Sequence, residues 1–438
     1  MNRNVASLVL VALIAGLQGG CTLYNEVEVA PLQVLPSNID RGSDIESMLL
    51  KADYLRAMEM GATFDARQRV SAPNMAALGR AYMTSGRYDE ARTRLRSALD
   101  LNPFRAVYAQ IAWDLSQVEY MCNNFESSLE WALIAQNRGL SIRQWHLDYL
   151  KALASVRVYN FSGENHAQLP FAFGRPDVPR IRARLNHAHD TEAIIDSGAV
   201  LSIISQRLAD SLKVKSLGDF EGTFYGLLGE PIPVRFAILE TLELGGMVIG
   251  NVPVAIMPDD KMRFLISRGE QKVFRMDFLL GSNLLKEFRI ELDFNGPRAI
   301  FTKLQERRPA ADQNIFFAGF RPHVRGSVNK HAWFLFILDT GSEITFLNES
   351  RLNSLPVQRL AAGSHSATLQ GLGGAMKRGS KLENVELGLD KWGGRFRTLP
   401  MYWAEDKDQA VGIIGQNFLR NFNVVIDFGR MRVDLKRR

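Results

Sequence analysis

An internal repeat in the C-terminal part of the chain constrains its fold more than any other feature. Three positions recur at one constant shift, so that Leu185, Asn186 and Asp196 correspond to Val328, Asn329 and Asp339. A longer block, LLGSNLLKEFRIELDF at 279–294, recurs as IIGQNFLRNFNVVIDF at 413–428. Two matched blocks in the same order predict two lobes of one architecture, which we place at 168–305 and 314–438.

The residues in and around the repeat are typical of β-strands. Short runs such as PVRFAILE, VPVAIMP and FLFILD alternate with turns rich in Gly, Asn and Asp. Helical periodicity largely disappears beyond Arg180. With 438 residues, the chain is too long for one core and has room for several domains. We therefore expect all-β lobes over its C-terminal two-thirds.

The segment before the repeat has the pattern of helices. From Ile45 to about Gly139, Ala and Leu recur at spacings of three and four residues. Small and large residues alternate there as in two antiparallel helices that pack closely: Leu78, Gly79, Tyr82, Gly86, Tyr88, Ala91, Leu95, Ala98 and Pro103. This spacing resembles the tetratricopeptide repeat (TPR), and a degenerate copy follows at 115–135. We expect a TPR-like helical domain at 40–150.

Each lobe contains an apolar strand that leads directly into an acidic turn. The two turns are Asp196-Ser197-Gly198 and Asp339-Thr340-Gly341. An Asp beside a buried strand is costly unless its charge is satisfied. A Ser or Thr followed by Gly supplies a hydroxyl and free backbone N–H groups for that purpose. One such turn is a weak signal, but two in matched positions predict one shared site.

These motifs resemble the aspartic peptidases, both the two-lobed pepsin type and the retroviral type, in which single lobes dimerise. The resemblance covers the chain from near Val178 to the C-terminus. It includes an element of two apolar residues and Gly that in this family crosses behind each active-site turn: Leu279-Leu280-Gly281 and Ile413-Ile414-Gly415. The implied fold class is multidomain, with a TPR-like helical domain followed by a duplicated, β-barrel-like acid protease fold.

The resemblance also implies an activity and a mechanism. Asp196 and Asp339 would form the catalytic pair of an aspartic endopeptidase and would share one proton and one water. Ser197 and Thr340 would cross-link the two turns through hydroxyl-to-backbone bonds, and Gly198 and Gly341 would permit their close approach. This chemistry requires no cofactor, no metal and no covalent intermediate.

An enzyme of this kind needs a flap that closes over an extended peptide. The candidates are Tyr225 and Gly226 in lobe one, and Gly371 and Gly373 in lobe two. Tyr225 invites comparison with the flap tyrosine of pepsins, although its spacing from Asp196 differs. The alternative is an ordinary aromatic residue in a hairpin.

The N-terminal segment, residues 1–21, resembles the signal peptide of a bacterial lipoprotein. Arg3 precedes an apolar stretch that runs to Leu17, and small residues lead to Cys21. Gln18 stands where the lipobox usually has Leu, so simple secretion is the alternative. We expect Cys21 to be lipidated, which would anchor an exported protein facing the periplasm. Thr22 favours the outer membrane.

Composition argues against several classes of function. The formal net charge is +6, but Lys and Arg are spread along the chain without a dense basic run, which argues against nucleic-acid binding. Two cysteines cannot build a disulfide framework. The histidines, including His187, His189 and His323, have no metal-ligand spacing, and we expect them at the surface.

Two questions about partners stay open at this level. The chain could cleave a peptide or protein substrate that its helical repeats dock, or it could be a non-catalytic, periplasmic peptide-binding scaffold. The repeats could also bind a separate protein partner. Because one chain carries both acidic turns, we expect an active monomer, with a retroviral-type dimer as the alternative.

Overall fold

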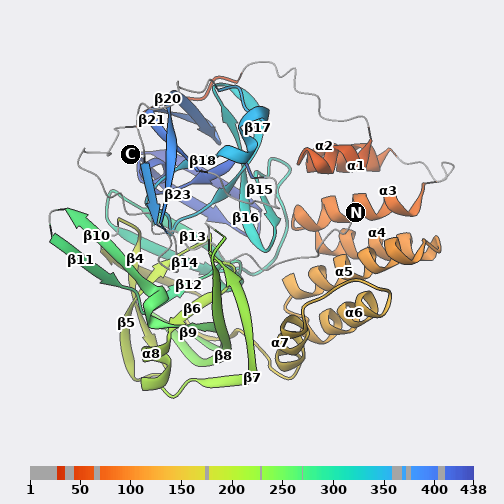
Figure 1. Cartoon of the computed structure of the whole chain (residues 1–438), viewed down its shortest axis with the longest axis horizontal. Helices are drawn as coiled ribbons and strands as arrows, with labels where there is room; N and C mark the ends of the chain where they lie inside the picture. Colours follow the sequence, from red (N-terminus) through yellow and green to blue (C-terminus); the bar gives the residue numbers. More distant parts are fainter. Residues whose placement is uncertain are drawn as a thin grey trace.

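The structure is a computed structural model. The residues that it describes are 27–34, 44–63, 70–172, 177–226, 229–268, 270–357, 367–370, 376–402 and 410–438. After one short strand, a helical region is followed by two β-rich lobes, which confirms the predicted order of α and β parts (Figure 1). Within the described ranges, no helix is long and apolar enough to cross a membrane.

The helical region is a series of antiparallel neighbours. Its helices are α1 (Ile45–Leu50), α2 (Tyr54–Ala62), α3 (Ala72–Thr84), α4 (Tyr88–Asp100), α5 (Arg105–Met121), α6 (Phe125–Asn137) and α7 (Gln144–Ala154). Ser71 caps α3 by accepting a hydrogen bond from the N–H of Asn74 (3.4 Å). Helices α3 and α4 approach closely because Gly79 has no side chain; a Cβ there would lie 2.7 Å from Cγ of Leu95.

Lobe one is built from short strands with a few helical turns. Its elements are β2 (Asn160–Gly163), β3 (His166–Ala172), β4 (Arg180–Leu185), β5 (His189–Ile195), β6 (Ser202–Ser205), α8 (Gln206–Ser211), β7 (Lys215–Tyr225), β8 (Pro231–Leu244), β9 (Met247–Met257), η1 (Asp259–Met262), β10 (Arg263–Arg268), β11 (Glu270–Arg275), β12 (Phe278–Leu280), α9 (Ser282–Leu285), β13 (Phe288–Asp293) and β14 (Arg298–Lys303). Alternate residues of β13 are buried, as expected for a strand with one face on the core.

Lobe two repeats much of this order. Its elements are β15 (Ile315–Ala318), β16 (Arg321–Val328), β17 (His331–Leu338), β18 (Phe346–Asn348), η2 (Glu349–Ser354), β19 (Ala367–Gln370), β20 (Met376–Leu389), β21 (Trp392–Tyr402), β22 (Gly412–Ile414), α10 (Gln416–Leu419), β23 (Phe422–Asp427) and β24 (Arg432–Arg437). Strand β1 (Glu28–Pro31), from the start of the described chain, adds to this lobe by pairing with β21.

The strand pairings show that the lobes share one topology. In lobe one, β12 runs parallel to β5 and antiparallel to β6; in lobe two, β22 runs parallel to β17 and antiparallel to β18. The hairpins before β5 and β17 also correspond. Asn186 and Asn329 both adopt positive φ (48° and 47°), and the side-chain oxygen of each accepts a backbone N–H from a third strand.

A shared sheet joins the lobes. Strand β13 of lobe one pairs antiparallel with β23 of lobe two, so that Leu292 lies opposite Val424. The order β24-β23-β13-β14-β3 therefore takes strands from both lobes. Because backbone hydrogen bonds set this register, the lobes have a fixed relative position.

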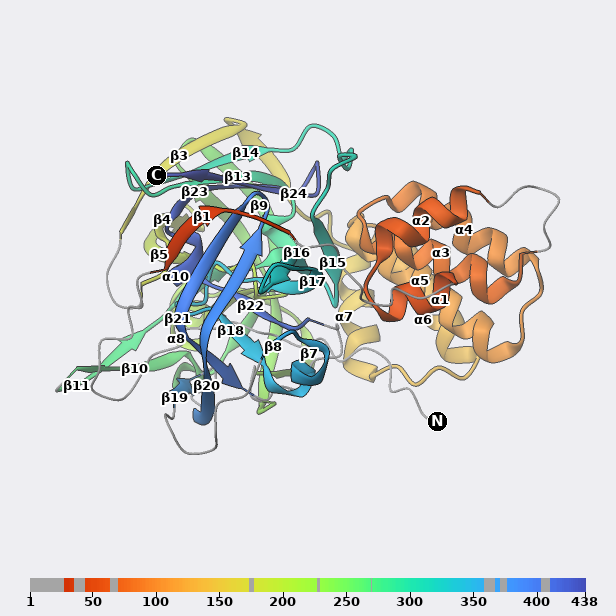
Figure 2. The same cartoon turned by 90° about the horizontal axis from the view of Figure 1, so that it is seen from above.

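The helical region packs on both lobes and lies to one side of them (Figure 2). Tyr120 of α5 contacts Phe320 beside β16, with ring centroids 4.9 Å apart. In the turn after α5, the amide of Asn123 donates to Glu287 (2.9 Å) and accepts from Lys286 (2.7 Å). The helices are therefore part of the same packed body as the lobes.

Candidate active site

The two acidic turns begin where β5 and β17 end. The N–H of Asp196 donates to the carbonyl of Leu280 (3.0 Å), and the N–H of Asp339 donates to the carbonyl of Ile414 (3.1 Å). Asp196 thus follows β5, which pairs with β12 of the Leu279-Leu280-Gly281 element. Asp339 follows β17, which pairs in the same way with β22 of the Ile413-Ile414-Gly415 element. The same backbone arrangement holds both carboxyl groups.

Reciprocal hydrogen bonds connect the turns across the lobe boundary. The hydroxyl of Ser197 donates to the carbonyl of Leu338 (2.7 Å) and accepts from the N–H of Thr340 (3.1 Å). The hydroxyl of Thr340 donates to the carbonyl of Ile195 (2.7 Å) and accepts from the N–H of Ser197 (3.0 Å). Both hydroxyls are buried, so this cross-link is shielded from competing water.

The glycines of the turns bring the carboxyl groups together. A Cβ at Gly198 would lie 2.4 Å from Cγ of Asp339, and a Cβ at Gly341 would lie 2.4 Å from Cγ of Asp196. Each carboxyl group therefore lies against the opposite turn. Any side chain in place of either glycine would displace the carboxyl group of the opposite aspartate.

The aspartates are buried, and their carboxyl groups influence each other's pKa. Oδ1 of Asp196 accepts from the N–H of Ala199, and Oδ1 of Asp339 accepts from the N–H of Gly341, both at 2.9 Å. Oδ2 of Asp339 has no backbone donor of this kind among the described residues. A buried carboxylate oxygen in that position favours a proton shared by the pair.

Burial is the main cause of a raised pKa at both carboxyl groups. It raises the pKa of Asp196, and the donated N–H groups and the bond with Asp339 oppose this rise. It also raises the pKa of Asp339, and the adjacent charge of Asp196 raises it further. Two acids in this state lose their protons as a pair, the second at a higher pH than an ordinary carboxyl group.

A second layer of side chains supports the turns from behind. Ser282 donates its hydroxyl to the carbonyl of Ser197 (2.6 Å), and Gln416 donates its amide to the carbonyl of Thr340 (2.7 Å). Neither Ser282 nor Gln416 belongs to the acidic turns by which the sequence indicates the site. A usable signal existed, because the two residues occupy the same position in the two copies of the longer repeated block.

The flap candidate of lobe one lies at the end of a long hairpin. Tyr225 is the last residue of β7 and faces Pro231 of β8, and the N–H of Gly226 donates to the carbonyl of Glu230 (2.9 Å). The hydroxyl of Tyr225 accepts a hydrogen bond from Arg143 of the helical region (3.3 Å). The lobe-two candidates, Gly371 and Gly373, lie outside the described residues, as does Cys21.

One histidine lies elsewhere than its sequence context suggested. His323 was expected at the surface, but it is fully buried in β16, and its Nδ1 donates to the carbonyl of Arg321 (3.1 Å). Position in a strand next to a hairpin does not distinguish the two faces of the strand. In the described part of the chain, no group of three or more His, Cys, Asp or Glu residues is arranged to hold a metal ion.

An interaction beside the second turn was also missed. Glu343, which lies shortly after the second turn, accepts the N–H of Asp177 (2.5 Å), and Asp177 pairs with Arg420. Asp177 lies shortly before β4 of lobe one, whereas Glu343 and Arg420 belong to lobe two. The contact connects the lobes in addition to the shared sheet and the cross-link of the two turns.

A comparison with models of known protein families gives a match in lobe one. Residues 181–284 match the model of the aspartyl protease family. The matched range contains Asp196, the β7–β8 hairpin and the Leu279-Leu280-Gly281 element. Lobe one is therefore similar to an aspartyl protease domain, and this similarity supports a peptidase activity in general terms. No curated protein matches the chain.

Solved structures of two aspartic proteases are similar to the chain. One is a retropepsin-like aspartic protease from Rickettsia conorii, with 20% identity and a TM-score of 0.23 over 33% of this chain and 96% of that one. The other is the aspartic proteinase from Irpex lacteus, with 11% identity and a TM-score of 0.35 over 62% of this chain and 97% of that one.

The cross-link predicts a large effect of a small substitution. Thr340→Ala removes one hydroxyl and leaves the buried N–H of Ser197 and carbonyl of Ile195 without that partner, which should cost about 2–4 kcal/mol of unfolding free energy. Thr340→Ser keeps the hydroxyl and should cost much less. Urea denaturation measures both, and equal stability of the two variants would contradict a stabilising role of this bond.

Proposed function

We propose that this protein is an aspartic endopeptidase that uses Asp196 and Asp339 as a catalytic pair. The supporting observation is the reciprocal cross-link of Ser197 and Thr340, which joins two buried carboxyl groups from different lobes at one point. Turns that served only to end two strands would not need to be connected through each other's hydroxyls.

The mechanism follows from a pair that holds one proton. The ionised carboxyl group accepts a proton from a water molecule as the water oxygen attacks the carbon of the scissile carbonyl. The protonated carboxyl group donates its proton to the carbonyl oxygen, which gives a neutral tetrahedral diol. Transfer of a proton to the amide nitrogen then accompanies cleavage of the C–N bond and releases two peptides.

Activity should depend on pH with two limbs. The pair is inactive when it has lost its shared proton and when both groups are protonated. Since burial raises both pKa values, the alkaline limb should lie above the ordinary titration range of carboxyl groups. The rate should therefore fall on both sides of a maximum in a profile of kcat/KM against pH.

Substitution of either aspartate tests the assignment. Asp196→Asn and Asp339→Asn should each lower kcat/KM by roughly 10⁴-fold, because each removes one proton-transfer group. Cleavage of a random peptide pool, with and without a statine-type inhibitor, measures this. Asp190→Asn on the exposed part of β5 is the control and should retain activity. Residual turnover in either dyad variant would show that the pair is misassigned.

The Asp339→Asn variant also tests the raised pKa through its effect on the stability of the fold. A raised pKa in the folded state contributes stability that is present below the unfolded pKa and is lost as pH rises through the folded pKa. Asp339→Asn should therefore gain stability relative to the unmodified protein between acidic and neutral pH.

Inactivity together with binding of the peptide pool by the unmodified protein would favour the scaffold function instead. Gel filtration should find the cleavage activity in the monomer.

We further propose that the helical region is TPR-like and docks the substrate. An apolar groove, here called the helical groove, has a volume of about 590 Å³ and is lined by side chains that include Leu50, Met83, Val107 and Ile111. A neighbouring hollow shares Tyr54, Arg80, Met83 and Thr84 with it and ends at residues 317–320 of lobe two. Because the helical groove continues to lobe two, we favour the protein substrate that the lobes would cleave as its occupant over a separate protein partner.

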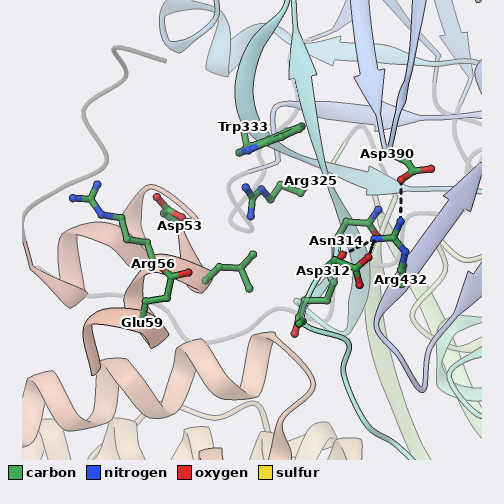
Figure 3. Close-up of a pocket in the computed structure, with 12 residues that line it drawn as sticks. Asp53, Arg56, Glu59, Asp312, Asn314, Arg325, Trp333, Asp390 and Arg432 are labelled. Carbon is green, nitrogen blue, oxygen red and sulfur yellow. Dashed lines mark hydrogen bonds and ion pairs between the residues drawn. The ribbon is translucent and has the colours of Figure 1, made fainter. Parts of the chain in front are cut away.

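A third hollow lies between α2 and lobe two and differs in character from the helical groove. Charged side chains line it, among them Arg56, Glu59, Arg325 and Arg432 (Figure 3). Arg432 already pairs with Asp390 of its own lobe and with Asp312, which lies just before that lobe. The apolar helical groove is therefore the better candidate for docking an apolar segment of a substrate.

A pair of matched variants separates docking from chemistry. Leu50→Glu places a charge in the helical groove, whereas Leu133→Glu places one on α6 outside it; both leucines are exposed (58% and 41%). Leu50→Glu should slow cleavage of a protein substrate severalfold and leave cleavage of short peptides unchanged. Equal rates for the two variants on the protein substrate would contradict docking in the groove.

Finally, we propose that Cys21 is lipidated after export and that the protein is anchored at the periplasmic face of a membrane. The support is the signal-like segment that ends at Cys21. In cells fed labelled palmitate, Cys21→Ser should abolish labelling of the protein, whereas Cys122→Ser should not. An unlabelled but exported parent protein would favour simple secretion.

A further inference from the structure

The β7–β8 hairpin of lobe one is covered on one side by helix α7. Both views place α7 beside these strands (Figures 1 and 2). Trp145 stacks on Phe236 of β8, with centroids 5.6 Å apart and planes 18° apart, and meets Phe224 of β7 edge-on at 6.4 Å. Phe224 is fully buried, although it lies one residue before the end of its strand. The part of the hairpin next to its turn is therefore packed, not free.

A glycine makes this packing possible. A Cβ at Gly222 of β7 would lie 2.7 Å from Phe236 and 3.2 Å from Trp145. The two rings consequently pass directly over the backbone of the strand. Gly222 also follows an irregularity in the β7–β8 pairing between Ser216 and Glu221. Such a bulge bends and twists a hairpin, so α7 contacts the segment beyond the bend.

Arg143 extends the contact to the residue before the turn. Its guanidinium carbon lies 5.2 Å from the ring centroid of Tyr225, and its Nη2 donates to the hydroxyl of Tyr225 (3.3 Å). Arg143 is the N-cap residue of α7, so the start of the helix fixes its backbone. One side chain thus binds both the face and the polar end of the tyrosine.

Helix α7 is in turn anchored in the helical core. His146 packs on Trp113 of α5 with centroids 5.4 Å apart, and Leu147, Tyr149 and Leu150 are buried. Tyr149 also contacts Phe236, with centroids 4.6 Å apart. Any displacement of the hairpin from α7 would break contacts that continue into the helical core.

We propose that Arg143 and Trp145 are positioning residues that clamp the β7–β8 hairpin, so that the helical region holds the lobe-one flap in place before substrate arrives. The role of the hairpin as a flap rests on the proposed peptidase function, but the clamp itself is a physical contact that exists without catalysis. A flap ordered in advance loses less conformational entropy when it closes on a peptide. The clamp should therefore act mainly on substrate affinity.

Hydrogen–deuterium exchange of the full-length mature protein tests the clamp without any assay of activity. Arg143→Ala should speed exchange of the amides around Tyr225 roughly fivefold, as expected for the loss of one cation–π contact and one hydrogen bond. Arg143→Lys keeps the charge and should recover part of the protection. Arg138→Ala is the matched control, because Arg138 makes a comparable contact with Tyr108 (4.1 Å) within the helical region.

Kinetics supply a second readout. Arg143→Ala should raise the KM for a peptide and the Kd of a statine-type inhibitor roughly fivefold, the same factor by which it should speed amide exchange. The kcat should stay within about twofold of the unmodified protein. Because Trp145→Ala removes a large packed ring and can unfold the interface, Trp145→Phe serves as the milder variant and should give an intermediate effect.

The outcomes separate the two hypotheses. Unchanged exchange around Tyr225 in both Arg143→Ala and Trp145→Phe overturns the clamp, whatever the activity. Faster exchange with unchanged KM and Kd overturns its positioning role. Absence of cleavage by the unmodified protein overturns the proposed function, and the exchange result still decides whether the hairpin is clamped.

Discussion

The reciprocal hydroxyl bonds between the two acidic turns are the interaction on which the rest of the structure depends. Each hydroxyl satisfies a buried backbone carbonyl and a buried N–H of the other turn, so neither lobe can complete its own hydrogen bonding alone. The close approach that these bonds require explains the glycines, and the resulting burial of two carboxyl groups explains their raised pKa values.

Larger interfaces hold the lobes at the distance that this cross-link needs. The β13–β23 pairing fixes their register by backbone hydrogen bonds, and the contacts of Asp177 with Glu343 and Arg420 add side-chain bonds near the second turn. The helical region packs against both lobes and reaches the supports of the first turn, since Asn123 binds residues directly after α9. The helical region is thus connected through packed and hydrogen-bonded residues to the element that supports the first turn.

The sequence predicted the order of helical and β parts and the two lobes, because the internal repeat is a pattern that can be read from the residues alone. The repeat also points to both acidic turns, because they lie at matched positions in its two copies. It could not predict the burial of His323, since a strand's period does not say which face meets the core, nor the pairing of β13 with β23. The contact of Arg143 with Tyr225 joins positions far apart in the chain and in different parts of the fold, and a single sequence contains no signal for it.

Among the residues that the structure describes, the bond from Asp177 to Glu343 has no equivalent on the other lobe. At the position that corresponds to Glu343, lobe one has Val200, which is buried and has no charge. In a symmetric dimer of identical lobes, the two directions of a bound peptide would be equivalent. Here the two lobes differ directly beside the acidic turns. The two directions in which an extended peptide could lie across the turns are therefore not equivalent in this molecule.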